Sequence, residues 1–126
     1  MPDDAAATPP ARHILLVEDE AVVRDVIAEI LSDDGMVVSA YPSAESLLRW
    51  MPTATERPHA MILDVLLGPG LDGFALAAQV RERWPGLPVI FVSGDLRPLV
   101  RLSGRNDLCL MKPFTADVLL HLVHDL

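Results

Sequence analysis

The chain alternates short apolar runs with segments of helical spacing. Five runs are rich in β-branched and aliphatic residues and show no strict polar alternation, which is typical of strands buried on both faces. They are His13–Val17, Met36–Ala40, Ala60–Leu63, Val89–Val92 and Leu108–Met111. Parallel strands need crossover connections, and helices between the runs would supply them. The pattern therefore predicts an α/β domain in which helices cover both faces of a five-stranded parallel sheet.

Five helices are expected between and after these strands. Their apolar positions are Val22, Val23, Val26, Ile27, Ile30 and Leu31; then Ala44, Leu47 and Leu48; then Phe74, Ala77, Ala78 and Val80; then the short segment Pro98–Ser103; and finally Val118, Leu119, Leu122 and Val123. Ser43 and Asp72 are predicted N-caps, because short polar side chains accept hydrogen bonds from the first free amides of a helix. Gly35 is expected to end the first helix, and Pro85 the third.

The chain divides into an arm and a domain. Residues 1–12, MPDDAAATPPAR, are rich in Ala and Pro without periodicity, so we expect a flexible N-terminal arm. Residues 13–126 are expected to form one domain, because a 13.7 kDa chain has no room for a second core.

Charge and cysteine content narrow the class of protein. Acidic residues outnumber basic ones 18 to 10, for a net charge of -8, which argues against direct binding to nucleic acid. No apolar run approaches the roughly 18 residues that cross a bilayer, and the acidic start does not resemble a signal peptide, so no membrane insertion is expected. Cys109 is the single cysteine and cannot form an internal disulfide, which favours a cytoplasmic protein.

Polar side chains follow four of the five predicted strands. Glu18 and Asp19 come directly after the first run, Asp64 after the third, Ser93 after the fourth and Lys112 after the fifth. Because ligands of open parallel sheets bind beyond the carboxyl ends of the strands, these side chains are expected to form one site.

The chemistry of this set suggests phosphoryl transfer. Clustered carboxylates repel one another, and a hard dication relieves that repulsion. Oxygen ligands without His or Cys suit Mg²⁺, with Mn²⁺ as the other candidate, held by Glu18 and Asp19. Asp64 would then be a nucleophile that forms an acyl phosphate, while the Lys112 ammonium and the Ser93 hydroxyl neutralise the phosphoryl oxygens.

Four motifs in this order resemble the receiver domain of two-component response regulators. They are I-x-L-V-E-D-E from Ile14, L-D-V-L-L-G-P-G-L-D-G from Leu63, V-S-G from Val92 and K-P-F from Lys112, and the likeness covers His13 to Leu126. The resemblance implies a flavodoxin-like, doubly wound sheet with strand order 2-1-3-4-5. It also implies phosphoryl transfer to Asp64 from the phosphohistidine of a histidine kinase or a phosphotransfer protein.

The resemblance assigns further roles to the strand-end residues. Mg²⁺ would be held by Asp19, Asp64 and the backbone carbonyl of Leu66, with Glu18 helping through water. Ser93 and Lys112 would bind the phosphoryl oxygens, and the peptide bond between Lys112 and Pro113 would be cis.

Three positions depart from the family pattern. Gly68-Pro69-Gly70 adds one residue to the loop after Asp64, and Cys109 replaces the Tyr or Phe whose rotation usually reports phosphorylation. The third departure is the pair Leu66 and Asp95, which would flank the path of the water that hydrolyses the acyl phosphate. Leu66 offers that water no hydrogen bond, so we expect slow self-dephosphorylation.

Several alternatives remain open. The chain could be a diffusible single-domain regulator, the receiver of a hybrid histidine kinase, or a degenerate receiver that serves as a binding scaffold. A magnesium-dependent phosphatase with external turnover is disfavoured, because Leu66 stands where such enzymes carry their general acid. We expect catalysis only of the chain's own phosphorylation and dephosphorylation. An apolar helix at Pro98–Ser103, with the fifth strand and last helix, would suit homodimerisation.

Overall fold

The computed structural model describes residues 11–67, 72–95 and 106–126. Within them, five parallel strands form one sheet in the order β2-β1-β3-β4-β5. The strands are β1 His13–Val17, β2 Val37–Tyr41, β3 Ala60–Asp64, β4 Val89–Ser93 and β5 Asp107–Met111. The helices are α2 Ala21–Asp33, α3 Ala44–Trp50, α4 Gly73–Arg83 and α5 Ala116–His124, with a 3₁₀ turn at Met51–Thr53. The predicted α/β fold and strand order are confirmed.

Some predictions fall outside the described part of the chain. The helix expected at Pro98–Ser103 and nearly all of the expected arm at residues 1–12 lie there, as does the segment Gly68-Pro69-Gly70, which adds one residue to the loop after Asp64. None of the described helices is both long and apolar enough to cross a membrane.

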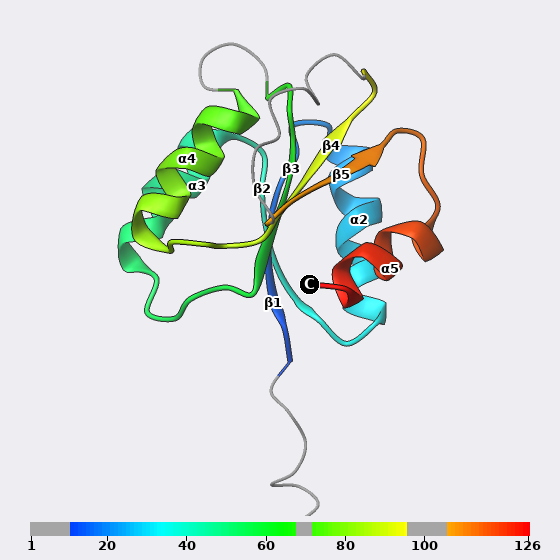
Figure 1. Ribbon diagram of the computed structural model, residues 1–126, viewed down its shortest axis with the longest axis horizontal. Coiled ribbons are helices and arrows are strands. Elements are labelled where there is room, and N and C mark those ends of the chain that lie inside the picture. Colours follow the sequence, from blue (N-terminus) through cyan, green and yellow to red (C-terminus); the bar gives the residue numbers. More distant parts are fainter. Residues whose placement is uncertain (1–10, 68–71, 96–105) are drawn as a thin grey trace, which may run out of the picture.

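Within the described residues, two helices cover each face of the sheet. Figure 1 shows α3 and α4 on one side of the strands and α2 and α5 on the other. Each side has its own apolar cluster, because successive side chains of a strand point to opposite faces. Leu15 and Leu63 pack toward α3 and α4, while Ile14 and Ile62 pack toward α2 and α5. The site described below therefore lies on a sheet that is fixed from both sides.

The second strand lies one residue later than the sequence predicted. We expected Met36–Ala40, but the strand is Val37–Tyr41. Met36 is buried, yet its amide donates to the carbonyl of Leu31, which closes the end of α2, and the strand ladder begins at Val37. An apolar residue that ends a helix cannot be distinguished from a strand residue by hydropathy alone.

The apolar stripe of the first helix is only partly core. Ile27 and Leu31 are buried as expected, whereas Val22 is 76% exposed and Val26 is 49% exposed. Val118 and Ala78, also expected on apolar faces, are exposed as well, whereas the predicted caps and the end of α4 agree with the structure. Ser43 caps α3 and Asp72 caps α4 through their side-chain oxygens, and α4 ends at Arg83, before Pro85.

Candidate functional site

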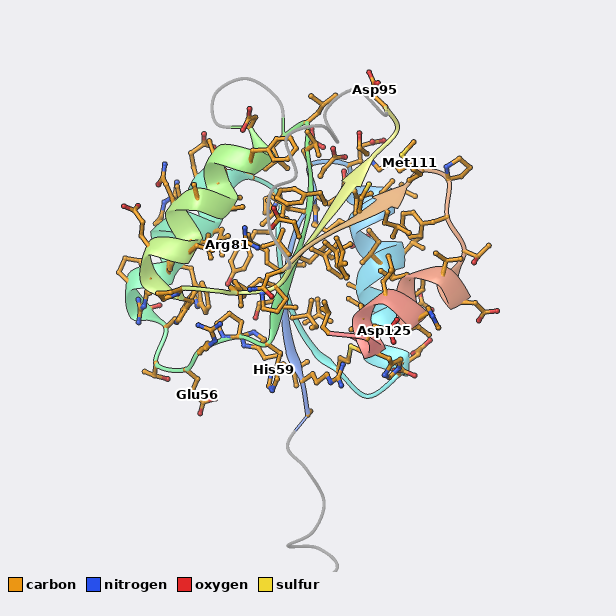
Figure 2. All side chains as sticks on the ribbon, viewed as in Figure 1. Glu56, His59, Arg81, Asp95, Met111 and Asp125 are labelled. Atoms are coloured by element: carbon orange, nitrogen blue, oxygen red, sulfur yellow. The ribbon has the colours of Figure 1, made fainter. Side chains whose placement is uncertain are left out.

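The strand-end residues predicted from the sequence lie along one edge of the sheet. Figure 2 places Asp95 and Met111 at the end where β4 and β5 finish, with Glu56 and His59 at the opposite end. Backbone hydrogen bonds continue past the strands at this edge. The amide of Glu18 donates to the Tyr41 carbonyl at 3.1 Å, and the amide of Lys112 donates to the Ser93 carbonyl at 2.9 Å.

Asp64 and Lys112 form the centre of the site. The Lys112 ammonium donates to Oδ2 of Asp64 at 2.6 Å, across 48 residues of sequence. The other carboxylate oxygen, Oδ1, accepts a hydrogen bond from the Leu66 amide at 2.8 Å. Asp64 is only 7% exposed, so both of these contacts hold a carboxylate that is largely removed from water. A charge-assisted contact of this length fixes the orientation of the carboxylate.

Three consecutive acidic residues border this pair. Carboxylate oxygens of Glu18, Asp19 and Glu20 lie within 4.8 Å of one another. Glu18 and Glu20 also lie 3.5 and 3.7 Å from the Lys112 ammonium. The sequence pattern predicts Glu18 and Asp19 as site residues but not Glu20, because an acidic residue just before a helix is common as a charge that stabilises the helix N-terminus. The uninterrupted run E-D-E was the available signal.

Burial and charge shift the titration of two groups in the site. Burial raises the pKa of the Glu18 carboxyl to about 7, and the neighbouring charge of Asp64 adds to that rise. Partial burial by itself would lower the pKa of Lys112, but its hydrogen bond and attraction to Asp64, together with Glu18 and Glu20, raise that pKa above its ordinary value. The site therefore holds more negative charge than its single ammonium can neutralise.

The residues present fit a hard divalent cation. Carboxylate oxygens of Glu18, Asp19 and Glu20 cluster without His or Cys, and the Asp64 charge is near enough to raise the pKa of Glu18. Such a set of hard oxygen donors is the chemistry that Mg²⁺ prefers. A dication there would also relieve the repulsion that raises the pKa of Glu18. The proposed contribution of the Leu66 carbonyl stays a prediction.

Ser93 reaches the edge of the site but is engaged within its own loop. Its hydroxyl donates to the Asp95 carbonyl at 2.9 Å and accepts from the Asp95 amide at 3.0 Å. The residue is 2% exposed and ends the strand that neighbours β3. Ser93 is thus placed beside Asp64 by the sheet, with its hydroxyl turned toward Asp95.

Gly73 lets α4 begin directly against the end of β3 that carries Asp64. The Gly73 amide donates to the Val65 carbonyl at 2.9 Å, just beyond Asp64. A Cβ atom at position 73 would lie 2.6 Å from the Asp64 carbonyl oxygen and 2.9 Å from the Cα of Val65. These contacts are shorter than backbone atoms tolerate, so only glycine allows this close approach.

The remaining sequence predictions concern residues near the site. The Lys112–Pro113 peptide bond is cis, as the family resemblance implied. Cys109 pairs with Phe91 on the neighbouring strand and is half-buried, and burial raises the pKa of its thiol. His121 and His124 of α5 are exposed.

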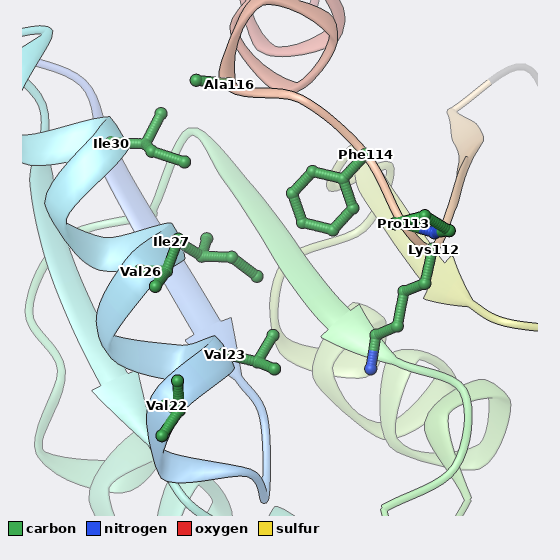
Figure 3. Close-up of a pocket in the computed structure, with 9 residues that line it drawn as sticks. All are labelled: Val22, Val23, Val26, Ile27, Ile30, Lys112, Pro113, Phe114 and Ala116. Carbon is green, nitrogen blue, oxygen red and sulfur yellow. The ribbon is translucent and has the colours of Figure 1, made fainter.

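An apolar groove opens beside the site. Its volume is about 590 Å³, and it separates α2 from the segment between β5 and α5. Figure 3 shows the valines and isoleucines of α2 on one wall, Phe114 and Pro113 on the other, and the Lys112 side chain at the end of the groove. The lining residues are Val22, Val23, Val26, Ile27, Ile30, Lys112, Pro113, Phe114 and Ala116. One residue, Lys112, therefore belongs both to the groove and to the acidic site.

Comparisons with known proteins place this geometry in a family. A model of the response regulator receiver domain matches residues 14–124. The transcriptional regulatory protein CssR of Bacillus subtilis is 33% identical over 105 residues, which is 80% of this chain and 44% of that protein. The transcriptional regulatory protein CseB of Streptomyces coelicolor is 36% identical over 110 residues, 85% of this chain and 45% of that protein. The chain thus spans less than half the length of these relatives.

Solved structures agree with the sequence relatives. A response regulator receiver protein from Sinorhizobium medicae superposes with a TM-score of 0.82 at 26% identity, covering 91% of this chain and 93% of that one. The receiver domain of NtrX from Brucella abortus gives a TM-score of 0.76 at 33% identity, with 89% and 95% covered. The fold, the strand-end residues and the family match agree, and the chain belongs to the response regulator receiver domain family of two-component systems.

Proposed function

We propose that this chain accepts a phosphoryl group on Asp64 from a phosphohistidine, with Mg²⁺ as cofactor, and thereby changes its contacts with other proteins. The observation that carries the proposal is the placement of Asp64, which is nearly buried, oriented by Lys112 at 2.6 Å and bordered by the acidic run from Glu18 to Glu20. The family membership of residues 14–124 supports the same chemistry.

The transfer needs a free carboxylate oxygen on Asp64. That oxygen attacks the phosphorus, the new P–O bond forms, and the P–N bond to the donor imidazole breaks with its electron pair returning to that nitrogen. Oδ1 is held by the Leu66 amide and Oδ2 by Lys112. Because the Lys112 side chain is flexible and partly exposed, its ammonium can move from the carboxylate to an oxygen of the arriving phosphoryl group.

The other residues neutralise charge around the transferred group. Glu18, Asp19 and Asp64 would hold Mg²⁺, which when bound supplies positive charge to the phosphoryl oxygens. The Ser93 hydroxyl would turn from the Asp95 carbonyl to a phosphoryl oxygen. This movement would alter the loop after β4. The phosphorylation signal could then pass through that loop without an aromatic residue at position 109, where this chain has Cys109.

The groove between α2 and the β5–α5 segment is proposed as the docking site for the phosphohistidine donor. Exposed Val22 and Val26 offer an apolar surface that leads to Lys112, so a donor helix seated there would bring its histidine close to Asp64. Val26→Asp should then slow transfer from a phosphorylated histidine kinase domain and leave phosphorylation by acetyl phosphate unchanged.

The direct test of the function is the intact mass of the chain after incubation with acetyl phosphate. With Mg²⁺ present, the wild-type protein should gain the mass of one phosphoryl group, and the gain should disappear in excess EDTA. Asp64→Asn is the matched control, because it keeps the shape of the side chain. A gain in the Asn variant, or none in the wild type with any small phosphodonor, would contradict the proposal.

Turnover of an external substrate is not expected. Leu66 follows Asp64 by two residues and offers no proton to a leaving group, so the chain would catalyse only its own phosphorylation and dephosphorylation. Homodimerisation through residues 98–103, β5 and α5 stays a prediction, because residues 98–103 lie outside the described part.

A further inference from the structure

The acidic turn between β1 and α2 is held by the residue that ends its first helical turn, Arg24. Its Nη1 donates to the backbone carbonyl of Glu18 at 2.9 Å, and its backbone amide donates to the carbonyl of Glu20, also at 2.9 Å. Any residue could make the second bond, because it is the ordinary first bond of a helix. The first bond depends on the arginine side chain.

The Glu18 carbonyl needs a hydrogen-bond donor from the protein. Glu18 is 1% exposed and stands where β1 has ended, so water has little access to this residue. On its other side, the Glu18 amide donates to Tyr41, and Oε1 of its carboxylate accepts from the Glu20 amide at 3.2 Å. The Arg24 side chain thus ties the helix to the same peptide segment that carries the candidate metal ligands.

Arg24 acts on the backbone of this segment rather than on its carboxylates. The groups that shift the pKa of Glu18 are its burial, Glu20, Asp64, Lys112 and Asp19, and all of the charged ones belong to the site itself. The half-buried guanidinium instead contacts a carbonyl, and its planar shape fixes the direction of that contact. A lysine side chain has the same charge, but it is shorter and lacks the planar guanidinium group.

We propose that Arg24 is a positioning residue for the divalent cation. By holding the Glu18 carbonyl, it sets the direction in which the carboxylates of Glu18 and Asp19 leave the backbone, so that they meet Asp64 with the cation between them. The inference rests on the proposed function, because it assumes that these carboxylates bind Mg²⁺. Residues outside the first ligand shell typically change metal affinity tenfold or more when replaced.

The test is the Mg²⁺ dissociation constant, measured by calorimetry on the full chain. Arg24→Met removes the bond and the charge, and Arg24→Lys removes the guanidinium geometry and keeps the charge. We expect both to weaken Mg²⁺ binding by about tenfold. Arg49→Met, on the exposed face of α3, is the matched control and should bind as the wild type does.

The rate of phosphorylation at different Mg²⁺ concentrations distinguishes a positioning role of Arg24 from general damage to the fold. At saturating Mg²⁺, the maximal rate with acetyl phosphate should recover in Arg24→Lys, while the Mg²⁺ concentration for half the maximal rate stays raised. Unchanged Mg²⁺ affinity in both Arg24 variants would overturn the inference and leave the proposed function standing. An Arg24→Lys affinity equal to that of the wild type would also overturn it, since charge alone would then suffice. Absence of Mg²⁺ binding to the wild type would overturn both proposals.

Discussion

The ammonium of Lys112 lies 2.6 Å from Oδ2 of Asp64, so the ends of β5 and β3 are joined by an ion pair across the carboxyl edge of β4. Lys112 is the only lysine in the chain. It also lies within 4 Å of Glu18 and Glu20, and it lines the end of the groove beside α2. This one side chain therefore connects Asp64, the proposed acceptor, with the acidic run and the proposed donor surface.

Replacing Asp64 should change the titration of Lys112. The hydrogen bond and charge of Asp64 offset the effect of burial and raise the pKa of the ammonium, so Asp64→Asn should lower that pKa. Selective ¹⁵N labelling of lysine gives a single side-chain signal for this measurement, because no second lysine is present. An unchanged Lys112 pKa in the Asn variant would show that the pair contributes nothing in solution.

Glu18→Gln should stabilise the metal-free protein at alkaline pH. The pKa of Glu18 is raised from 4.5 to about 7 in the folded state, so between these values the folded chain binds more protons than the unfolded chain. Its contribution to stability is complete below the lower value and is lost as pH rises through about 7. In EDTA, the Gln variant should therefore gain a few degrees of Tm over the wild type at pH 8 and little at pH 5.

The wild type and the Gln variant share all other titrating groups, so the difference between their Tm values reports the titration of Glu18. A Tm difference that is the same at both pH values, or larger at pH 5, would contradict the raised pKa. Addition of Mg²⁺ at pH 8 should stabilise the wild type more than the variant, because the Glu18 carboxylate then binds the cation directly or accepts a hydrogen bond from a water bound to it.

Leu66→Asn should shorten the lifetime of the phosphorylated form. Leu66 is 68% exposed and its amide donates to the Asp64 carboxylate, so we expect its side chain to border the path of a hydrolytic water and to offer that water no hydrogen bond. An amide side chain can orient that water, and we expect decay to speed up by roughly tenfold. Val37→Asn, an exposed apolar position on β2, is the control. Equal or slower decay in the Leu66 variant would count against this role.

Gly73→Ala should damage both stability and phosphoryl acceptance. Its Cβ would lie 2.6 Å from the Asp64 carbonyl oxygen, so the start of α4 or the end of β3 has to move. We expect a loss of about 1–3 kcal/mol in the free energy of unfolding. Gly94→Ala meets no atom within 4 Å and serves as the stability control. Denaturant unfolding of the two variants, measured side by side, decides the point.

The sequence predicted the sheet and the site because the two are linked by a simple rule. Buried parallel strands read as apolar runs, and the first polar residue after each run lies at a common edge, which placed Asp64, Ser93 and Lys112 correctly. The pattern does not predict how each side chain is oriented at that edge. Ser93 is next to the acceptor strand, yet its hydroxyl bonds to Asp95, and no local signal in the sequence distinguishes these orientations.

Other features depend on contacts between distant segments. Val22 and Val26 have the spacing of core residues, and only the position of α5 and Phe114 leaves them exposed at a groove. Met36 is apolar and buried like a strand residue, but a hydrogen bond to Leu31 assigns it to the end of α2. Glu20 resembles an ordinary helix-start charge until the packing of β5 brings Lys112 beside it.

The central claim, that Asp64 is the phosphoryl acceptor, is tested most directly by mapping the modified residue. After phosphorylation with acetyl phosphate and Mg²⁺, borohydride reduces an aspartyl phosphate to homoserine, and peptide mass spectrometry locates that product. We expect homoserine at position 64 in the wild type and none when EDTA is present. Homoserine at another aspartate, a phosphoryl group on a histidine, or no reduced residue at all would contradict it.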